Sequence, residues 1–427
     1  MRKNRLLTRI VLAVAVVSLV LSGALYSVAM AKTKIVVATH YGGGQKEPLE
    51  AYFKEYMKLH PDIEIVHETV PFDDYFKKIQ TSRMSGQSPD IYHIYSLWAP
   101  SLVKNKILDA PPAFVINDVR ANYVEAAIDG ATINNKIWGY PTEIDNYALV
   151  YNKRLLKEAG YDNPPKTWDE LVEMAKKMTK YDKNGKITQA GFAFMRGWDS
   201  AVVHPFLSLL WANGGEFLAK DFSKALFNGP EGVAALEQEL ALFKAKATDD
   251  TVQVWSFPTG TVGMMIMAPW YENSLETGMK DKYADVGVAP IPPGKKGYAN
   301  ALYTWMFAVD SNSKVKKEAW EFLKWLNNKR DNGSTSRVGD FLVGQGILPS
   351  QKVDLDNHPK ELKDKFSSVF VDQLKYAHAE PNVLQGQEIK TVLMQEIETA
   401  WFGKKTAKQA LDDAARKIND ILAENYE

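Results

Sequence analysis

Hydrophobic and polar positions along residues 32–427 follow two different periods. Short apolar or β-branched runs, many with a period of two, predict strands at residues 35–38, 63–66, 90–95, 147–151, 190–195, 262–267 and 302–309. Apolar residues spaced three and four apart predict helices at residues 47–60, 72–84, 168–178, 204–211, 233–245, 315–326 and 406–422. Strands that alternate with helices predict mostly parallel sheets covered by helices on both faces. Ligands of such sheets bind at the carboxyl ends of the strands.

Residues 137–153 predict a segment that leaves one lobe and enters another. The Tyr140-Pro141 step disfavours helix before the proline, and a β-rich run follows. Glu143 and Asp145 lie between the two. Because they are two residues apart on an extended chain, they point to the same side. A ligand held between two lobes would lie at these carboxylates.

Two further segments are candidate crossings, the stiff proline-rich residues 286–294 and residues 344–349. The length of 427 residues also suits two or three domains. The predicted division places residues 1–31 in a signal peptide, residues 32–143 and 295–346 in lobe 1, and residues 144–294 and 347–427 in lobe 2.

The N-terminal segment has the pattern of an export signal. Positive residues precede an almost unbroken apolar run at residues 10–21, and the small-residue site Ala29-Met30-Ala31 follows. We therefore expect cleavage before Lys32. An uncleaved anchor is the alternative, because residues 10–30 are nearly long enough to span a bilayer.

Composition narrows the function further. Lys and Arg number 52 and so do Asp and Glu, with no basic stripe, which argues against a nucleic-acid partner. The chain has no cysteine, which excludes disulfides, cysteine-ligated zinc and thiol catalysis. It also excludes a lipid-modified cysteine at the mature N-terminus. An exported protein without that anchor needs a closed compartment, so we expect the periplasm.

Several short motifs occur in a characteristic order after the export signal. They are Ser88-Pro89-Asp90-Ile91, Trp138-Gly139-Tyr140-Pro141, residues 149–153, residues 165–171, residues 263–270 and residues 318–324. In this order, over nearly the whole mature chain, the sequence resembles the family 1 extracellular solute-binding proteins. These are substrate receptors of ABC importers for sugars and oligosaccharides, and the maltose-binding group is among them.

The resemblance implies a two-lobed periplasmic-binding-protein fold, type II-like, in which a hinge closes the lobes over a ligand. It also implies a membrane permease with a cytoplasmic ATPase as partners, and we expect a monomer without cofactor. By the maltose-binding pattern, Asp145 would bond sugar hydroxyls, Trp270 would stack on a sugar ring, and Trp198 could supply a second aromatic side chain. Leu97 and Trp98 stand where that pattern has polar residues, so its sugar contacts do not transfer to lobe 1.

A sugar needs hydrogen-bonding acceptors, amide donors and a flat aromatic platform. Most of the eleven Trp and nineteen Tyr residues belong to the core, but some lie at strand ends or crossings. The expected ligand-binding residues are His40, Tyr41, Ser96, Trp98, Glu143, Asp145, Asn146, Arg196, Trp198, Asp199, Trp270, Tyr271 and Trp305.

Other functions stay open at this level. The same receptor could bind a polyol, a phosphodiester or a polyamine, and a secreted carbohydrate-active enzyme is a third reading. Two acids on one strand do not flank a glycosidic bond as catalytic pairs do, which argues against catalysis. The seven histidines are scattered, without a His-x-x-x-His pair, so no metal site is expected.

Overall fold

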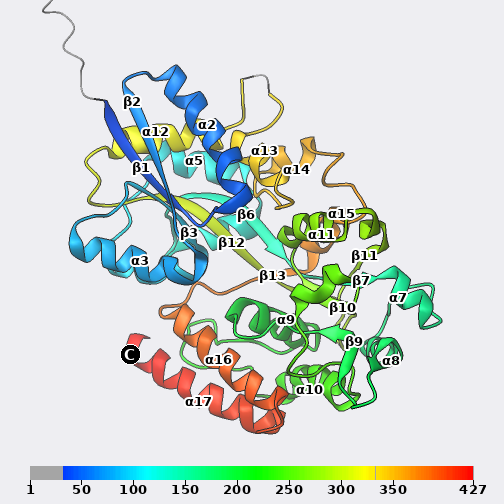
Figure 1. The fold of residues 1–427 in the computed structure, drawn as a ribbon. Coiled ribbons are helices and arrows are strands. Elements are labelled where there is room, and N and C mark those ends of the chain that lie inside the picture. Colours follow the sequence, from blue (N-terminus) through cyan, green and yellow to red (C-terminus); the bar gives the residue numbers. More distant parts are fainter. Residues whose placement is uncertain (1–31, 332, 427) are drawn as a thin grey trace, which may run out of the picture.

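The computed structural model describes residues 32–331 and 333–426, and the predicted signal peptide lies outside them. Two sheets, each with its own helices, form two lobes that lie side by side (Figure 1). Within the described residues, no helix has the length and apolar character needed to cross a bilayer. The expected two-lobed α/β fold is confirmed in this architecture and in the likeness to solved structures reported below.

Lobe 1 is built on a six-stranded sheet of order β13-β12-β3-β1-β2, in which β6 also pairs with β12. Its strands are β1 (Thr33–Thr39), β2 (Ile63–Thr69), β3 (Ile91–Tyr95), β6 (Tyr140–Asn146), β12 (Asn300–Val309) and β13 (Ala377–Ala379). Strand β1 runs parallel to β2 and β3, whereas β12 runs antiparallel to β3 and β6. A short hairpin, β4 (Thr132–Ile133) and β5 (Lys136–Ile137), lies outside the sheet.

Helices cover both faces of this sheet. They are α2 (Lys46–Leu59), α3 (Phe72–Ser85), α4 (Ala99–Lys104), α5 (Ala113–Asn122), α6 (Glu125–Gly130), α12 (Lys316–Asn327), α13 (Arg337–Val343) and α14 (Lys352–Asn357). Helix α2 buries Leu49 and Phe53 in one core. Helix α3 buries Tyr75 and Ile79 in another, which also holds Trp305. The two residues of each pair are four positions apart in the sequence, which places them on one face of the helix.

Lobe 2 is built on a five-stranded sheet of order β11-β7-β10-β9-β8. Its strands are β7 (Ala148–Asn152), β8 (Lys180–Tyr181), β9 (Ile187–Ala193), β10 (Val262–Met267) and β11 (Val286–Ala289). Strand β10 is parallel to β9 and antiparallel to β7, and β11 is antiparallel to β7. This sheet is therefore mixed, which differs from the mostly parallel sheet expected. The reason is that β7, which enters from the crossing, lies between β10 and β11 and runs opposite to both, and that β8 runs opposite to β9.

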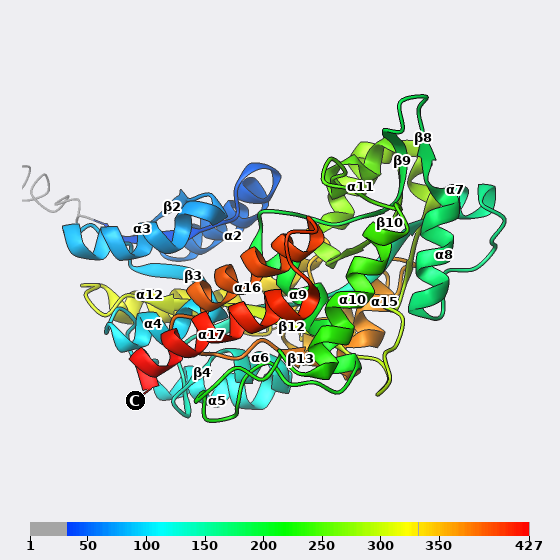
Figure 2. The same cartoon turned by 90° about the horizontal axis from the view of Figure 1, so that it is seen from below.

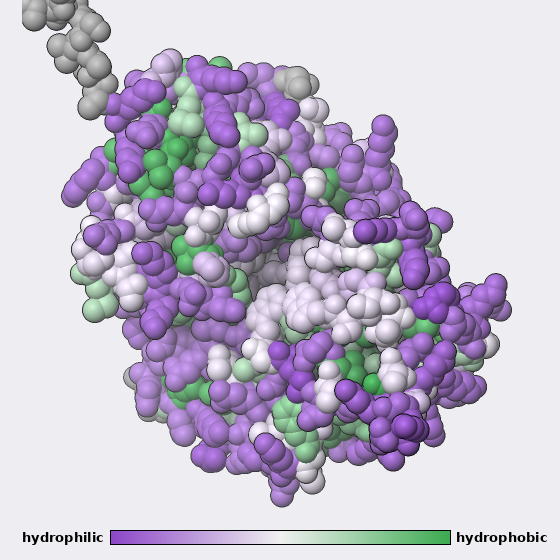
Figure 3. All heavy atoms as spheres, in the orientation of Figure 1, coloured by the Kyte–Doolittle hydropathy of each residue, from purple (hydrophilic) through white to green (hydrophobic). Residues whose placement is uncertain are grey.

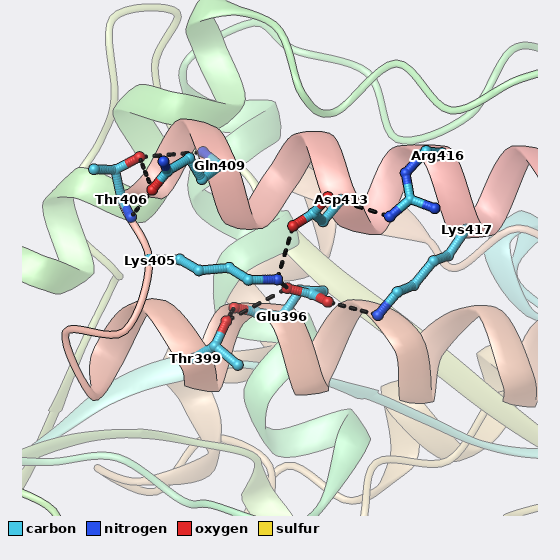
Figure 4. A network of polar contacts seen from close by, with 8 residues as sticks. All are labelled: Glu396, Thr399, Lys405, Thr406, Gln409, Asp413, Arg416 and Lys417. Carbon is cyan, nitrogen blue, oxygen red and sulfur yellow. Dashed lines mark hydrogen bonds and ion pairs between the residues drawn. The ribbon is translucent and has the colours of Figure 1, made fainter.

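The helices of lobe 2 include a long C-terminal pair. They are α7 (Lys153–Glu158), α8 (Trp168–Met178), α9 (Asp199–Ala212), α10 (Pro230–Lys244), α11 (Glu272–Met279), α15 (Ser367–Gln373), α16 (Gly386–Trp401) and α17 (Ala407–Tyr426). Helices α16 and α17 pack side by side (Figure 2). Near their connection, Glu396 holds Lys405 and Lys417 in one polar network (Figure 4). Short 3₁₀ helices are η1 (Gly43–Gln45), η2 (Ser96–Trp98), η3 (Val254–Thr259), η4 (Pro269–Tyr271), η5 (Lys280–Asp285) and η6 (Leu374–Tyr376).

The chain passes between the sheets at several points. Tyr147 separates β6 of lobe 1 from β7 of lobe 2, and residues 290–299 connect β11 to β12. The predicted division assigns all of residues 347–427 to lobe 2, but the chain in this region contacts both lobes. Pro349 pairs with Glu143 of β6, and β13 pairs with β12, so parts of 347–427 lie against the lobe 1 sheet before α16 returns to lobe 2. The residue limits of the lobes stay a prediction.

Candidate functional site

A cavity of about 180 Å³ lies where the two lobes meet. Its lining residues come from both lobes and from the first crossing. They are His40, Gln45, Phe72, Tyr95, Glu143, Asp145, Tyr147, Trp198, Ser200, Trp270, Tyr303, Trp305 and Ile347. Figure 3 shows a hollow near the centre of the face, with residues of intermediate hydropathy gathered around it. The carboxyl ends of β1 and β3 lie at this point, as expected for open α/β sheets.

Aromatic rings form most of the walls. On lobe 1, His40 stacks on Trp305 with 4.0 Å between ring centroids. On lobe 2, the centroids of Trp198 and Trp270 lie 5.6 Å apart. Phe72 of α3 meets the edge of Trp198 with 5.8 Å between centroids. The lobes therefore touch across the cavity, in a closed arrangement.

Backbone features place the two tryptophans of lobe 2. Gly197 has φ +72°, a left-handed conformation that glycine adopts freely, and it turns the chain just before Trp198. Trp198 then precedes the first residue of α9. Pro269 begins the 3₁₀ turn η4 that follows β10, and this turn places Trp270 at the cavity. Both rings are thus set at points where a regular element begins.

Two carboxylates, which we call the acidic floor, come from β6. Glu143 is 3% and Asp145 1% exposed. Tyr41, buried beneath the cavity, donates its hydroxyl hydrogen to Oε2 of Glu143. Burial and the neighbouring Asp145 raise the pKa of Glu143 well above its usual range. Burial raises the pKa of Asp145 to about 7, against hydrogen bonds to Tyr303 and to the backbone of Leu348 that act to lower it.

Two polar atoms of the lining residues have no partner within the described residues. They are Oδ1 of Asp145 and Nε1 of Trp198. A buried polar atom without a hydrogen bond carries a desolvation cost of about 1–3 kcal/mol. Because one atom is an acceptor and the other a donor, a ligand with hydroxyl groups could satisfy both.

The imidazole of His40 is neutral at physiological pH, since burial lowers its pKa to about 3. Its Nδ1 lies 3.3 Å from Nδ1 of His93, and Nε2 of His93 lies 2.8 Å from Oγ1 of Thr142. Burial and the neighbouring His40 likewise lower the pKa of His93. The lining therefore has no positive charge from these rings.

A second buried cluster lies behind the cavity and includes two of its tyrosines. Tyr95 of β3 donates its hydroxyl hydrogen to Glu380 and accepts a hydrogen bond of 2.7 Å from Lys390. The Lys390 ammonium also contacts Oε1 of Glu380 at 2.8 Å and Nε2 of His204 at 2.9 Å. An ammonium group only donates, so Nε2 of neutral His204 accepts. Its Nδ1–H is left to donate to the hydroxyl of Tyr147, 2.9 Å away. We call Tyr95, Glu380, Lys390 and His204 the Glu380 network.

The structure brings six of the expected residues to the cavity. They are His40, Glu143, Asp145, Trp198, Trp270 and Trp305. The other seven do not line it, and they are Tyr41, Ser96, Trp98, Asn146, Arg196, Asp199 and Tyr271. That any of the thirteen contacts a ligand stays a prediction.

Most of these seven have structural partners instead. Trp98 donates from Nε1 to Gln387 at 2.8 Å and packs on Phe72, whereas Asn146 donates to the carbonyl of Phe370 at 3.0 Å. Asp199 accepts a hydrogen bond from Gln387. The remaining contacts are Tyr41 with Glu143, Tyr271 edge-on to Trp255, Arg196 over the ring of Phe402, and Ser96 buried in the turn η2.

Seven lining residues were missed by the sequence reasoning. They are Gln45, Phe72, Tyr95, Tyr147, Ser200, Tyr303 and Ile347. Tyr95 is the last residue of a predicted strand, and Tyr147 lies inside the predicted crossing. These two could have been found by the reasoning that selected their neighbours. Phe72 and Tyr303 carry no such signal, because their spacing is that of ordinary core residues.

A larger depression, of about 680 Å³, lies on lobe 1 around Trp325 and Arg337. The residues that line it come from α2, α12 and the segment that leads to α13. A molecule bound there would contact one lobe only. It could not favour closure of the lobes, because a ligand shifts a conformational equilibrium only through different contacts in the two states.

Comparison with known proteins agrees with this architecture. A family model described as bacterial extracellular solute-binding protein matches residues 42–332. The chain belongs to this family. This solute-binding protein is 25% identical over 361 residues to the maltotriose-binding protein of Pyrococcus abyssi (strain GE5 / Orsay), covering 82% of the chain and 73% of that relative.

Solved structures share the fold of this solute-binding protein. The cyclic alpha-maltosyl-1,6-maltose binding protein from Arthrobacter globiformis has a TM-score of 0.77 and 25% identity, covering 92% of this chain and 100% of that one. An ABC transporter solute-binding protein from Thermotoga lettingae TMO, bound with alpha-D-tagatose, has a TM-score of 0.79 and 24% identity, covering 92% and 99%. The expected resemblance to family 1 solute-binding proteins is confirmed.

Proposed function

We propose that this protein captures a sugar in the cavity between its lobes and presents it to the membrane permease of an ABC importer, driven by a cytoplasmic ATPase. The observation that carries the proposal is a cavity whose walls come from both lobes, with carboxylates at its floor and tryptophans on its sides. A ligand that contacts both lobes favours the closed form, and closure is what a permease would recognise.

The lining matches the chemistry of a sugar. Carboxylate oxygens of Glu143 and Asp145 accept hydrogen bonds from hydroxyl groups. The rings of Trp198, Trp270 and Trp305 offer flat faces for the C–H surface of a sugar ring. The maltotriose-binding relative and the cyclic maltosyl-maltose binding structure, both 25% identical, support a sugar as the ligand class. Membership of an extracellular family supports the predicted export to the periplasm.

Binding without turnover is the second part of the proposal. Glu143 and Asp145 lie two residues apart on one strand, at the floor of the cavity. Glycosidases place their two carboxylates on either side of the scissile bond, about 5–9 Å apart. Release of a chromophore from a panel of chromogenic glycosides would contradict the proposal, and we expect none.

Calorimetry with a sugar panel tests the site. Once a sugar is found, we expect Asp145→Ala to weaken binding about tenfold or more, because a hydrogen bond to a charged group contributes about 1.5–3 kcal/mol. Trp270→Ala should weaken binding about two- to tenfold, because a ring contact contributes about 0.5–1.5 kcal/mol. Trp255→Ala is the matched control, since Trp255 is 51% exposed and outside the cavity. Unchanged affinity in both cavity variants would refute the site, and a panel without any binding sugar would refute the function.

A further inference from the structure

The charge of the cavity is one-sided. Glu143 and Asp145 are its two carboxylates, and none of the described residues that line it is a lysine or an arginine. His40 also lines the cavity, but its imidazole ring is neutral because burial lowers its pKa to about 3. Lys390 lies beyond Tyr95 and is already paired with Glu380. Among the described residues that line the cavity, therefore, none supplies a positive charge to the acidic floor.

Such an arrangement is costly in the ligand-free protein, because Glu143 and Asp145 are already buried there and burial raises the pKa of both. Removing a carboxylate from water costs several kcal/mol unless an opposite charge or hydrogen bonds replace the lost solvation. Tyr41 donates one hydrogen bond to Glu143, but Oδ1 of Asp145 has no partner among the described residues. A neutral guest could donate hydroxyl hydrogens to these oxygens. A guest with a positive group would supply both the hydrogen bonds and the missing charge.

The walls favour the same kind of guest. The faces of tryptophan and tyrosine attract cations, with about 0.5–2 kcal/mol for each well-placed ring. Tyr95, Tyr147, Trp198, Trp270 and Trp305 all line the cavity. At about 180 Å³ the cavity is also smaller than the range of about 300–1,000 Å³ typical of sites for drug-sized ligands. A compact ligand suits it better than a long chain.

Burial of an acid is not enough to define such a site. Glu239 on α10 is also fully buried, and burial raises its pKa to about 8. Its Oε2 accepts a hydrogen bond of 2.9 Å from Trp401, and it packs inside lobe 2 away from the cavity. Glu143 and Asp145 differ because they are adjacent, face a cavity between the lobes, and lie among aromatic rings.

We propose that the cavity prefers a single sugar-like ring that carries a protonated amine, with the ammonium group held by Glu143 and Asp145 and the ring faces on the tryptophans. This inference rests on the proposed function, since it names the ligand class of the same cavity. It adds one requirement to that function, a positive charge on the guest.

Calorimetry at neutral pH with matched probes tests this preference. D-glucosamine, D-glucose and N-acetyl-D-glucosamine share one ring but carry an ammonium, a hydroxyl and a neutral amide at the same position, and the corresponding galactose series covers the other common ring. We expect the amine member of at least one series to bind about tenfold or more tightly than its two neutral analogues. Tetramethylammonium chloride, a cation without a ring, should raise the melting temperature of the wild-type protein.

Variants separate charge from shape. Asp145→Asn and Glu143→Gln keep the side-chain volume, and each should weaken binding of the amine about tenfold while changing the affinity of a neutral analogue far less. Glu239→Gln is the matched control and should leave the preference intact, because Glu239 lies outside the cavity. Thermal melting of each ligand-free variant checks that it is folded, and the tetramethylammonium result does not depend on any variant.

Each alternative result is decisive. If neutral sugars bind as tightly as their amine analogues, or if only neutral sugars bind, the charge preference is wrong and the proposed sugar receptor stands. If neither neutral sugars, amino sugars nor tetramethylammonium bind, both proposals are wrong.

Discussion

Two of the groups of buried acids in the described residues, Glu380 and the acidic floor, are accommodated in opposite ways. Glu380 is 6% exposed and has Lys390, His204 and Tyr95 around it. Glu143 and Asp145 are buried at least as deeply, but Tyr41, Tyr303 and a backbone group are their partners, all of them neutral. The first group has a charged partner in the folded chain, whereas the second has only neutral partners among the described residues.

The comparison separates a group that stabilises the fold from a group that belongs to the candidate binding site. The Glu380 network connects β3 of lobe 1 with α9 and α16 of lobe 2, so it holds elements of both lobes together. It also fixes the hydroxyl groups of Tyr95 and, through His204, Tyr147, both of which line the cavity. The Glu380 network thus fixes two tyrosines of the cavity, whereas the acidic floor has no countercharge among the described residues that line the cavity. Unsatisfied groups of this kind are typical of functional sites.

The two groups also respond to pH with opposite signs. Burial acts to raise the pKa of Glu380, but the Lys390 ammonium outweighs it, and the pKa lies far below the usual range. A lowered carboxyl pKa stabilises the fold above the unfolded pKa, and this stability is lost as the pH falls. The pKa values of Glu143 and Asp145 are raised. Their ionisation costs stability, and that cost grows as the pH rises from about 4 towards 7 and above.

The largest expected effect follows from removing Lys390, the cation that pairs with Glu380. Lys390→Met leaves Glu380 buried without its strongest partner, and the loss of one member of a buried ion pair typically costs about 3–5 kcal/mol. We expect the free energy of unfolding in denaturant to fall by this amount at neutral pH.

The matched control for this change is Lys417→Met. The Lys417 side chain is 45% exposed and pairs with Glu396 at 2.7 Å, and exposed pairs contribute about 0–1 kcal/mol. If both substitutions cost the same, the Glu380 network does not hold the fold together as described, and the contrast between the two buried acid groups fails.

A smaller effect of opposite sign is expected at the acidic floor. Asp145→Asn removes a charge that the ligand-free fold pays to bury, so the variant should be more stable than the wild type at pH 8, on the order of 2–4 kcal/mol, since one pKa unit corresponds to about 1.4 kcal/mol. The gain should shrink as the pH falls and vanish below about pH 3, where the carboxyl group of the wild type is protonated in the folded state and largely protonated in the unfolded state. Unfolding free energies measured across this pH range give the difference curve.

Glu239→Gln is the control for this prediction, because it removes a buried carboxylate and keeps the size of the side chain, as Asp145→Asn does. It should show a pH-dependent gain of the same sign, because burial raises the pKa of Glu239 as well. Ligand affinity separates the two positions, since only the Asp145 variant should lose it. A variant of Asp145 that is less stable than the wild type at every pH would show that this carboxylate is a structural partner.

Much of this arrangement follows from local sequence patterns. The crossing at Tyr147 follows from the extended Tyr140-Pro141 step and the β-rich run after it, and the tryptophans at the ends of predicted strands include Trp270 and Trp305. The position of Asp145 on the last strand before the crossing is a local property as well. Such features depend on neighbours in the chain, so the sequence pattern predicts them.

The remaining features depend on distant parts of the chain. Trp98 also follows a predicted strand, but the 3₁₀ turn η2 directs it onto Phe72 and away from the cavity. Lys390 and Glu380 lie ten residues apart, on either side of the entry to α16, and their partners Tyr95 and His204 come from two other elements. Nothing in the pattern of hydrophobic positions indicates that these four side chains meet. Tertiary packing decides which face of an element looks into the cavity.

The smallest expected effects lie in the polar network between α16 and α17, where a buried carboxylate is paired with partly exposed lysines. This network tests whether charged partners or burial decide the stability of these acids. Glu396 is 4% exposed and bonds two cations, Lys405 at 2.5 Å and Lys417 at 2.7 Å (Figure 4). Lys405→Met and Lys417→Met should each lower the free energy of unfolding by less than about 1 kcal/mol, because the other lysine stays with the carboxylate. The double variant should cost more than the sum of the two by at least about 0.5 kcal/mol, since a buried carboxylate is then left without a cation, as at the floor of the cavity. Additive costs in denaturant unfolding would mean that solvent reaches Glu396 well enough to replace both lysines, and that its comparison with the acidic floor does not hold.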